Sequence, residues 1–97
     1  MESVEVNGNG PVFKINYDHK LVYFNASAIP YLLYWKCIAR NGLPEQLEKE
    51  HPEIFNRKSP SDYYEVDLKF HRQPVHFTVI PFPEAGWIGF YGEHSKQ

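Results

Sequence analysis

The side chains that could perform chemistry in this sequence are few, and their spacing does not favour catalysis. The single cysteine, Cys37, lies in the mainly apolar run YWKCIA, which is typical of a small buried hydrophobic residue. His51 precedes a proline, while His71 and His76 lie near a predicted hairpin turn without facing each other. No spacing of His, Cys, Asp and Glu fits a structural zinc site, and no Gly-x-Ser-x-Gly elbow or glycine-rich phosphate loop is present. The sequence therefore predicts no catalytic residues, no metal site and no enzymatic activity.

Composition narrows the functional class further. The 97 residues predict a single domain, and the net charge of −2 comes without any run of five basic residues. No stretch reaches the roughly 18 apolar residues that a membrane span requires. Residues 1–10 lack the basic and apolar regions of a secretory signal, and one cysteine cannot form an internal disulfide. These features predict a cytoplasmic protein that binds neither nucleic acid nor a membrane.

The elements that must position any site begin with a hairpin and a helical block. Two β-rich runs, 12–17 and 21–25, are separated by a polar turn, which predicts a hairpin. We expect Ser27 to be the N-cap of a helix that has Pro30 in its first turn and ends at Asn41-Gly42. Two shorter helical pieces, PEQLEKE and PEIFNRK, follow. Residues 1–11 and 94–97 are predicted to be flexible tails around a domain at 12–93.

The last third of the chain alternates apolar and polar residues, as a strand with one buried face does. A four-residue loop at 71–74 would place Phe70 opposite Val75, and one at 83–86 would place Phe82 opposite Trp87. Both hairpins then share one apolar face, so the predicted fold is α+β: a five-stranded antiparallel sheet with short helices packed on one face. That inner face consists of Tyr64, Val66, Leu68, Phe70, Val75, Phe77, Val79, Ile88 and Phe90.

The order of elements and several local motifs resemble a PAS domain, a small sensory module. LVYFNASAIPYLL is similar to the family's strand followed by Asn, a small residue and a Leu-Leu helix, and LPEQLEKEHPEIF is similar to its connecting segment. PVHFTVIPF and AGWIGFYGEH resemble its last two strands, but Glu93-His94-Ser95 replaces the Asp-Ile-Thr signature that precedes many effectors. The resemblance covers residues 12–93 and implies sensing or protein association, in some members with a flavin, haem or metabolite.

The resemblance leaves the cofactor unknown. The surroundings of Cys37 do not match the flavin photosensor motif, and His51 is the only histidine in the helical block that could serve a haem. If a ligand binds between the sheet and the first helix, the expected lining residues are Leu33, Cys37, Phe55, Phe77 and Phe90.

Two aromatic excesses suggest a surface for another chain. Tyr31, Tyr34 and Trp35 either line a pocket, contact a partner or pack beneath the later helices, whereas Leu32 and Leu33 are expected in the core. The outer sheet face carries a second group, expected to form a homodimer or partner surface: Ile80, Phe82, Trp87 and Tyr91. The leading expectation is a sensory or regulatory module in signal transduction, with a possible effector domain or partner protein. The alternatives are a ligand-free interaction module and a small cone-shaped α+β enzyme.

Overall fold

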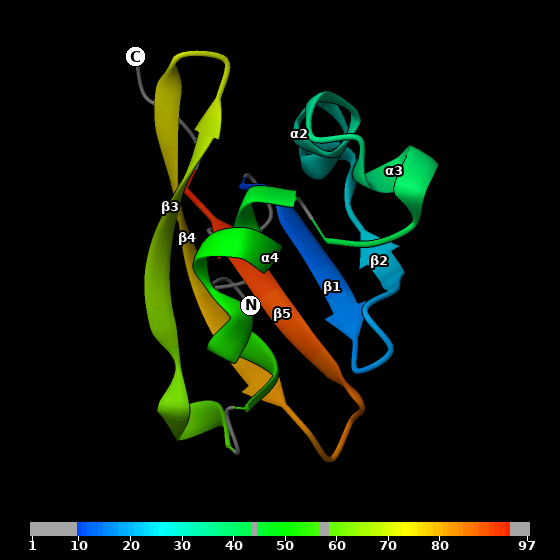
Figure 1. Cartoon of the computed structure of the whole chain (residues 1–97), viewed down its shortest axis with the longest axis vertical. Helices are drawn as coiled ribbons and strands as arrows, with labels where there is room; N and C mark the ends of the chain where they lie inside the picture. Colours follow the sequence, from blue (N-terminus) through cyan, green and yellow to red (C-terminus); the bar gives the residue numbers. More distant parts are fainter. Residues whose placement is uncertain (1–9, 44, 57–58, 94–97) are drawn as a thin grey trace, which may run out of the picture.

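The chain folds as a five-stranded antiparallel sheet with short helices on one of its faces. The structure, a computed structural model, describes residues 10–43, 45–56 and 59–93. The strands lie in the order β2-β1-β5-β4-β3, and every neighbouring pair is antiparallel (Figure 1). Their bounds are β1 Val12–Asn16, β2 Leu21–Phe24, β3 Tyr64–Phe70, β4 Gln73–Phe82 and β5 Trp87–Gly92. The predicted α+β class and the five-stranded sheet are confirmed.

The helical block between β2 and β3 is a series of short pieces. They are η1 Ala26–Ala28, α2 Ile29–Tyr34, α3 Cys37–Arg40, α4 Glu45–Glu50, η2 Pro52–Asn56 and η3 Pro60–Asp62. In Figure 1, α4 and the turn after it lie in front of the sheet, and α2 and α3 lie beside the β1–β2 end. The predicted tail at 94–97 lies outside the described residues, as do residues 1–9. Gly10 and Pro11, which we placed in the N-terminal tail, are buried, and the Pro11 carbonyl accepts a 2.7 Å hydrogen bond from the Gly92 N–H of β5.

The expected continuous helix is divided in two. Lys36 adopts the left-handed conformation, with φ of 64°, and this ends α2 after six residues and starts α3 in a new direction. The expected N-cap Ser27 is also wrong. Asn25 caps the first turn instead, because its side-chain oxygen accepts from the Ala28 N–H at 3.1 Å. Asn41 ends α3 in the left-handed conformation, which confirms the predicted stop.

The register of the last two strands follows the sequence pattern. Phe82 lies opposite Trp87, as predicted for a four-residue loop. The β3–β4 register is wrong by two residues, since Phe70 pairs with Gln73 across a two-residue turn. His71 permits this tight turn by adopting a φ of 59°. A shift of two residues keeps every side chain on its predicted face, because strand side chains alternate with a period of two.

The core lies between the inner sheet face and the helices. Phe13 from β1 stacks on Phe90, with ring centroids 4.6 Å apart and planes 2° apart, and the ring of Phe77 approaches Phe13 edge-on at 5.7 Å. Leu32, Cys37, Leu47 and Ile54 close this cluster from the helical side. These seven side chains are at most 1% exposed, so the centre of the molecule is filled by packed side chains.

Candidate functional surfaces

The five residues expected to line an interior pocket lie in three different environments. Cys37, Phe77 and Phe90 are fully buried within the core cluster. Phe55 is half-buried and lines a cleft of about 190 Å³ between the β1–β2 turn and η2. The expectation for Leu33 is wrong, both as a core and as a pocket residue: its side chain is 59% exposed. Leu32 faces the core, and the next residue of a helix points about 100° away from it.

The thiol of Cys37 has no environment that would activate it. Burial raises its pKa to about 12, and the nearby positive charge of Arg40 only partly opposes this. A thiol with so high a pKa carries almost no thiolate near neutral pH, and the thiolate is the nucleophile. Cys37 therefore acts as a packing residue of the core.

The cleft beside Phe55 has an apolar wall and two histidines at its edge. The imidazole of His19 stacks on the Phe55 ring at 3.9 Å with planes 6° apart, and Tyr17 meets the same ring edge-on at 6.0 Å. His51 also borders the cleft. The Tyr17 hydroxyl is buried without a hydrogen-bond partner among the described residues, and burial raises the pKa of Tyr17. This cleft offers a flat apolar surface, and the Tyr17 hydroxyl lies buried behind the Phe55 ring rather than in the cleft lining.

The outer sheet face gathers the four aromatic and aliphatic residues expected there. Ile80, Phe82, Trp87 and Tyr91 are all half-buried, and the rings of Phe82 and Trp87 lie 4.6 Å apart. The ring of Tyr91 lies over Gly89, where an added Cβ atom would come within 2.5 Å of it. We call this group, together with the neighbouring Lys14 and Tyr23, the outer aromatic patch.

Lys14 and Tyr23 belong to this patch but were missed in the sequence. The Lys14 ammonium lies 4.1 Å from the centroid of the Trp87 ring and 4.8 Å from that of Tyr23. Both distances are within the range of cation–π attraction. β1 of the first hairpin pairs with β5, and this pairing places Lys14 opposite Gly89, inside the patch. Both residues could have been found only by knowing that β1 pairs with β5, and no local sequence pattern indicates this pairing.

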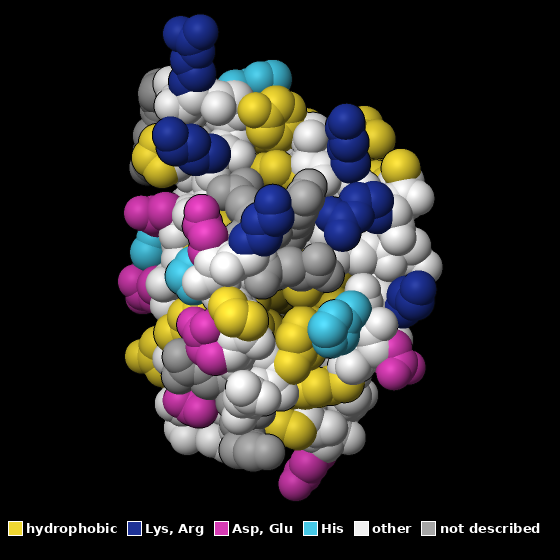
Figure 2. All heavy atoms as spheres, viewed as in Figure 1, with side chains coloured by type: hydrophobic (Ala, Val, Ile, Leu, Met, Phe, Trp, Pro, Cys, Tyr) yellow, Lys and Arg dark blue, Asp and Glu magenta, His cyan; other side chains and the backbone are white. Residues whose placement is uncertain are grey.

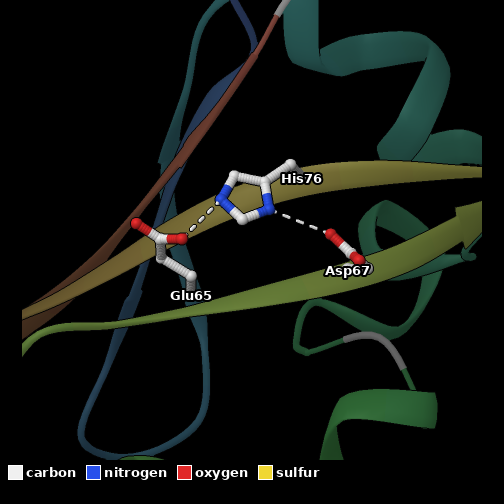
Figure 3. Close-up of polar contacts among 3 residues, drawn as sticks. All are labelled: Glu65, Asp67 and His76. Atoms are coloured by element: carbon white, nitrogen blue, oxygen red, sulfur yellow. Dashed lines mark hydrogen bonds and ion pairs between the residues drawn. The ribbon is translucent and has the colours of Figure 1, made fainter.

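A charged cluster lies on the same outer face of the sheet, towards its β3 edge. His76 on β4 lies between two carboxylates of β3, with Nδ1 2.9 Å from Asp67 Oδ1 and Nε2 2.9 Å from Glu65 Oε1 (Figure 3). The hydrogen bond with Asp67 raises the pKa of His76, partial burial opposes this, and the charge of Glu65 adds to the increase. The two carboxylates hold opposite edges of the ring, so the cluster is a cross-strand ion pair of the sheet surface.

A third feature is an open groove of about 720 Å³ at the end of the β3–β4 hairpin, bordered by α2. Tyr31 and Tyr34, two of the three residues of the first aromatic excess in the sequence, line it together with Phe70. Trp35 does not line the groove: it is 8% exposed and packs against Phe13 and Phe77. Tyr31 and Tyr34 therefore line the surface groove, whereas Trp35 packs in the core.

The part of the chain that the structure describes holds neither a cluster suited to a metal ion nor a helix suited to a membrane. Within residues 10–43, 45–56 and 59–93, no group of three or more His, Cys, Asp or Glu side chains is arranged to hold a metal ion. None of the helices in these ranges has the length and apolar character needed to cross a membrane.

Comparison with known proteins identifies the fold. No protein-family model matches the chain, and no curated protein matches it in sequence. The PAS domain from Bordetella pertussis BvgS is similar in structure, with a TM-score of 0.51 and 17% sequence identity. The similarity covers 97% of this chain and 81% of that domain. Together with the strand order and the motifs of the sequence, this similarity shows that the chain has the PAS fold.

Proposed function

We propose that this protein is a cytoplasmic regulatory module of the sensory type, which acts by self-association through the outer sheet face and performs no catalysis of its own. The outer aromatic patch is the observation that supports it most strongly. A cluster of four half-buried apolar side chains around Lys14 is typical of a surface that another chain covers. The single, buried cysteine suits a reducing compartment.

The distribution of charge on this face favours a second copy of the chain as the partner. Lys14 lies on β1 at one side of the patch, and Glu65 and Asp67 lie on β3 at the other. The strand order places β5 and β4 between them. A two-fold axis running along these central strands would lay β1 of one copy over β3 of the other and bring opposite charges together.

The filled interior favours association over binding of a ligand in the core. Phe13, Phe77 and Phe90 occupy the space between sheet and helices with no exposed area. The cleft beside Phe55, at about 190 Å³, is smaller than the roughly 300–1,000 Å³ of typical ligand pockets. The signal in this proposal is therefore the fraction of dimer, which an effector domain or partner protein would sense.

The test is the molar mass in solution, measured by light scattering over a concentration series from roughly 10 μM to 1 mM. We expect the mass to rise from one chain of 11.4 kDa towards two. Trp87→Glu places a negative charge within the patch, beside Phe82, and should weaken association at least about 30-fold, as loss of an interface hot spot does.

The matched control is Leu33→Glu, which makes the same kind of change at a side chain that is 59% exposed on the helical side. It should leave association unchanged. A wild-type chain that stays monomeric at the highest concentration would contradict the proposal. So would a folded Trp87→Glu variant that associates as the wild type does.

A further inference from the structure

The groove at the β3–β4 turn has the size and lining of a small-molecule site. Its volume of about 720 Å³ lies within the usual range of ligand pockets. In Figure 2, basic and histidine side chains surround hydrophobic ones at the upper end of the molecule, where Figure 1 shows this turn. The groove is separate from the outer aromatic patch, since α2 and the tip of the hairpin form it. It lies at the margin of the filled core, against which its lining residues Tyr31 and Val75 pack.

Three aromatic rings form one wall of the groove. The Phe70 ring centroid lies 4.3 Å from that of Tyr31 and 5.2 Å from that of Tyr34, and Tyr34 lies 4.4 Å from the imidazole of His71. Tyr34 remains 43% exposed, so its ring surface is available to a ligand. Flat aromatic surfaces of this kind bind another planar ring by offset stacking.

The wall is held in place by a contact between distant parts of the chain. The indole Nε1–H of Trp35 donates a 2.7 Å hydrogen bond to the Lys69 carbonyl, at the end of β3. This bond fastens α2 to the hairpin beside the groove. The aromatic wall therefore exists before any ligand arrives, which lowers the entropy cost of binding.

The polar lining of the groove favours a negative charge. Arg72, His71 and Gln73 line it, and none of its lining residues is acidic. No carboxylate in the described part of the chain forms an ion pair with Arg72. A guanidinium without such a partner, beside stacked rings, is suited to bind a carboxylate through paired N–H donors.

An extended peptide fits this groove poorly, because the strand edge beside it lacks a donor. β4 pairs with β5 only from Phe77 onward, so residues 73–75 have an open edge. The backbone carbonyl of His76 points towards the β5 side and accepts a hydrogen bond from the Glu93 N–H. Backbone groups two residues apart in a strand point to the same side, so the backbone nitrogen of Pro74 also faces the open edge. Proline has no N–H, so the open edge cannot form the ladder of a bound strand. A compact ligand is the better match.

We propose that this groove binds a small planar aromatic carboxylate, with its ring against Tyr34 and Phe70 and its carboxylate on Arg72. The site is independent of self-association through the outer sheet face, so either proposal can fail without the other.

The two tryptophans of the chain allow a direct test. The probe is 2-naphthoate, and its uncharged analogue 2-naphthalenemethanol is the matched ligand. In the uniformly ¹⁵N-labelled full chain, the indole N–H signal of Trp35 reports on the groove, because Trp35 packs against Tyr31 at 5.8 Å and bonds to Lys69. The signal of Trp87 reports on the outer aromatic patch. We expect naphthoate to shift Trp35 saturably and leave Trp87 in place.

Two variants and a control separate the parts of the site. Arg72→Gln should weaken naphthoate binding about three- to fivefold, as expected for a partly exposed ion pair, and leave the alcohol unaffected. Tyr34→Ala should weaken both ligands. Lys20→Gln removes an equal charge at the β1–β2 turn and should change neither. A naphthoate shift confined to Trp87, or equal binding of acid and alcohol, would overturn the proposal, as would unchanged affinity in Arg72→Gln.

Discussion

Replacing Asn25 with alanine should remove about 2–3 kcal/mol from the free energy of unfolding. The Asn25 side chain accepts hydrogen bonds from the N–H groups of Val12 at 3.0 Å and Ala28 at 3.1 Å, and donates to the Gly10 carbonyl at 3.0 Å. It thereby ties the start of β1 to the first helical turn. Each such bond contributes about 0.5–1.5 kcal/mol, and its loss leaves partly buried groups without partners. The predicted loss is a large fraction of the roughly 5–15 kcal/mol typical of a domain.

Urea unfolding followed by the fluorescence of the buried Trp35 measures this loss, with an unchanged m-value as the sign that the folded state stays intact. Asn25→Asp is the control, since it keeps both accepted bonds and loses only the one donated to Gly10. It should cost about half as much as the alanine variant. A cost below about 1 kcal/mol for Asn25→Ala, or equal costs for the two variants, would refute this reasoning.

Three further outcomes follow from the described contacts. Gly89→Ala should lower the free energy of unfolding by about 1–3 kcal/mol, because its Cβ would displace the Tyr91 ring, and Tyr91→Ala should relieve this cost in a double-mutant cycle. Because folding raises the pKa of His76, the protonated imidazole stabilises the folded state. This stabilisation is fully present below the pKa that His76 has in the unfolded chain, and it is lost as the pH rises through the higher pKa of the folded chain. His76→Gln should therefore reduce stability more at about pH 6 than at about pH 8.5, by on the order of 0.5 kcal/mol for this partly exposed group, and a pH-independent gap would contradict the assignment. Cys37 should react with an aromatic disulfide reagent more than about 100-fold more slowly in the folded chain than in urea, because its pKa of about 12 leaves little thiolate. Rapid labelling of the folded chain would show that the thiol is accessible and would contradict this prediction.

The faces of the sheet could be predicted because they depend on local alternation. Apolar residues at every second position of β3 indicate which side is buried, and the four-residue turn PEAG sets the β4–β5 register. The β3–β4 register was wrong because we expected a four-residue loop at 71–74, whereas β4 begins at Gln73 and includes Pro74. Proline is tolerated there, since β4 has no β5 partner at that position and loses no hydrogen bond.

The site residues were harder to predict because they depend on contacts between distant segments. Leu33 was placed inside with its neighbour Leu32, but consecutive residues of a helix point about 100° apart, and Leu32 takes the core side. The division of the helix was missed because a lysine at a positive φ is a break that sequence patterns rarely indicate. The sequence did show an excess of tyrosine in the helical block. It could not show that Tyr31 and Tyr34 would meet Phe70 from β3, which lies more than thirty residues away.

A dilution series recorded by NMR tests the central claim, self-association through the outer sheet face, most directly. The indole N–H signals of Trp87 and Trp35 are followed as the full chain is diluted from roughly 1 mM to 10 μM. Trp87 lies in the outer aromatic patch and Trp35 in the core, so we expect the Trp87 signal to move with concentration while the Trp35 signal stays in place. A Trp87 signal that stays constant over the whole range, or a shift at Trp35 alone, would contradict self-association through this face.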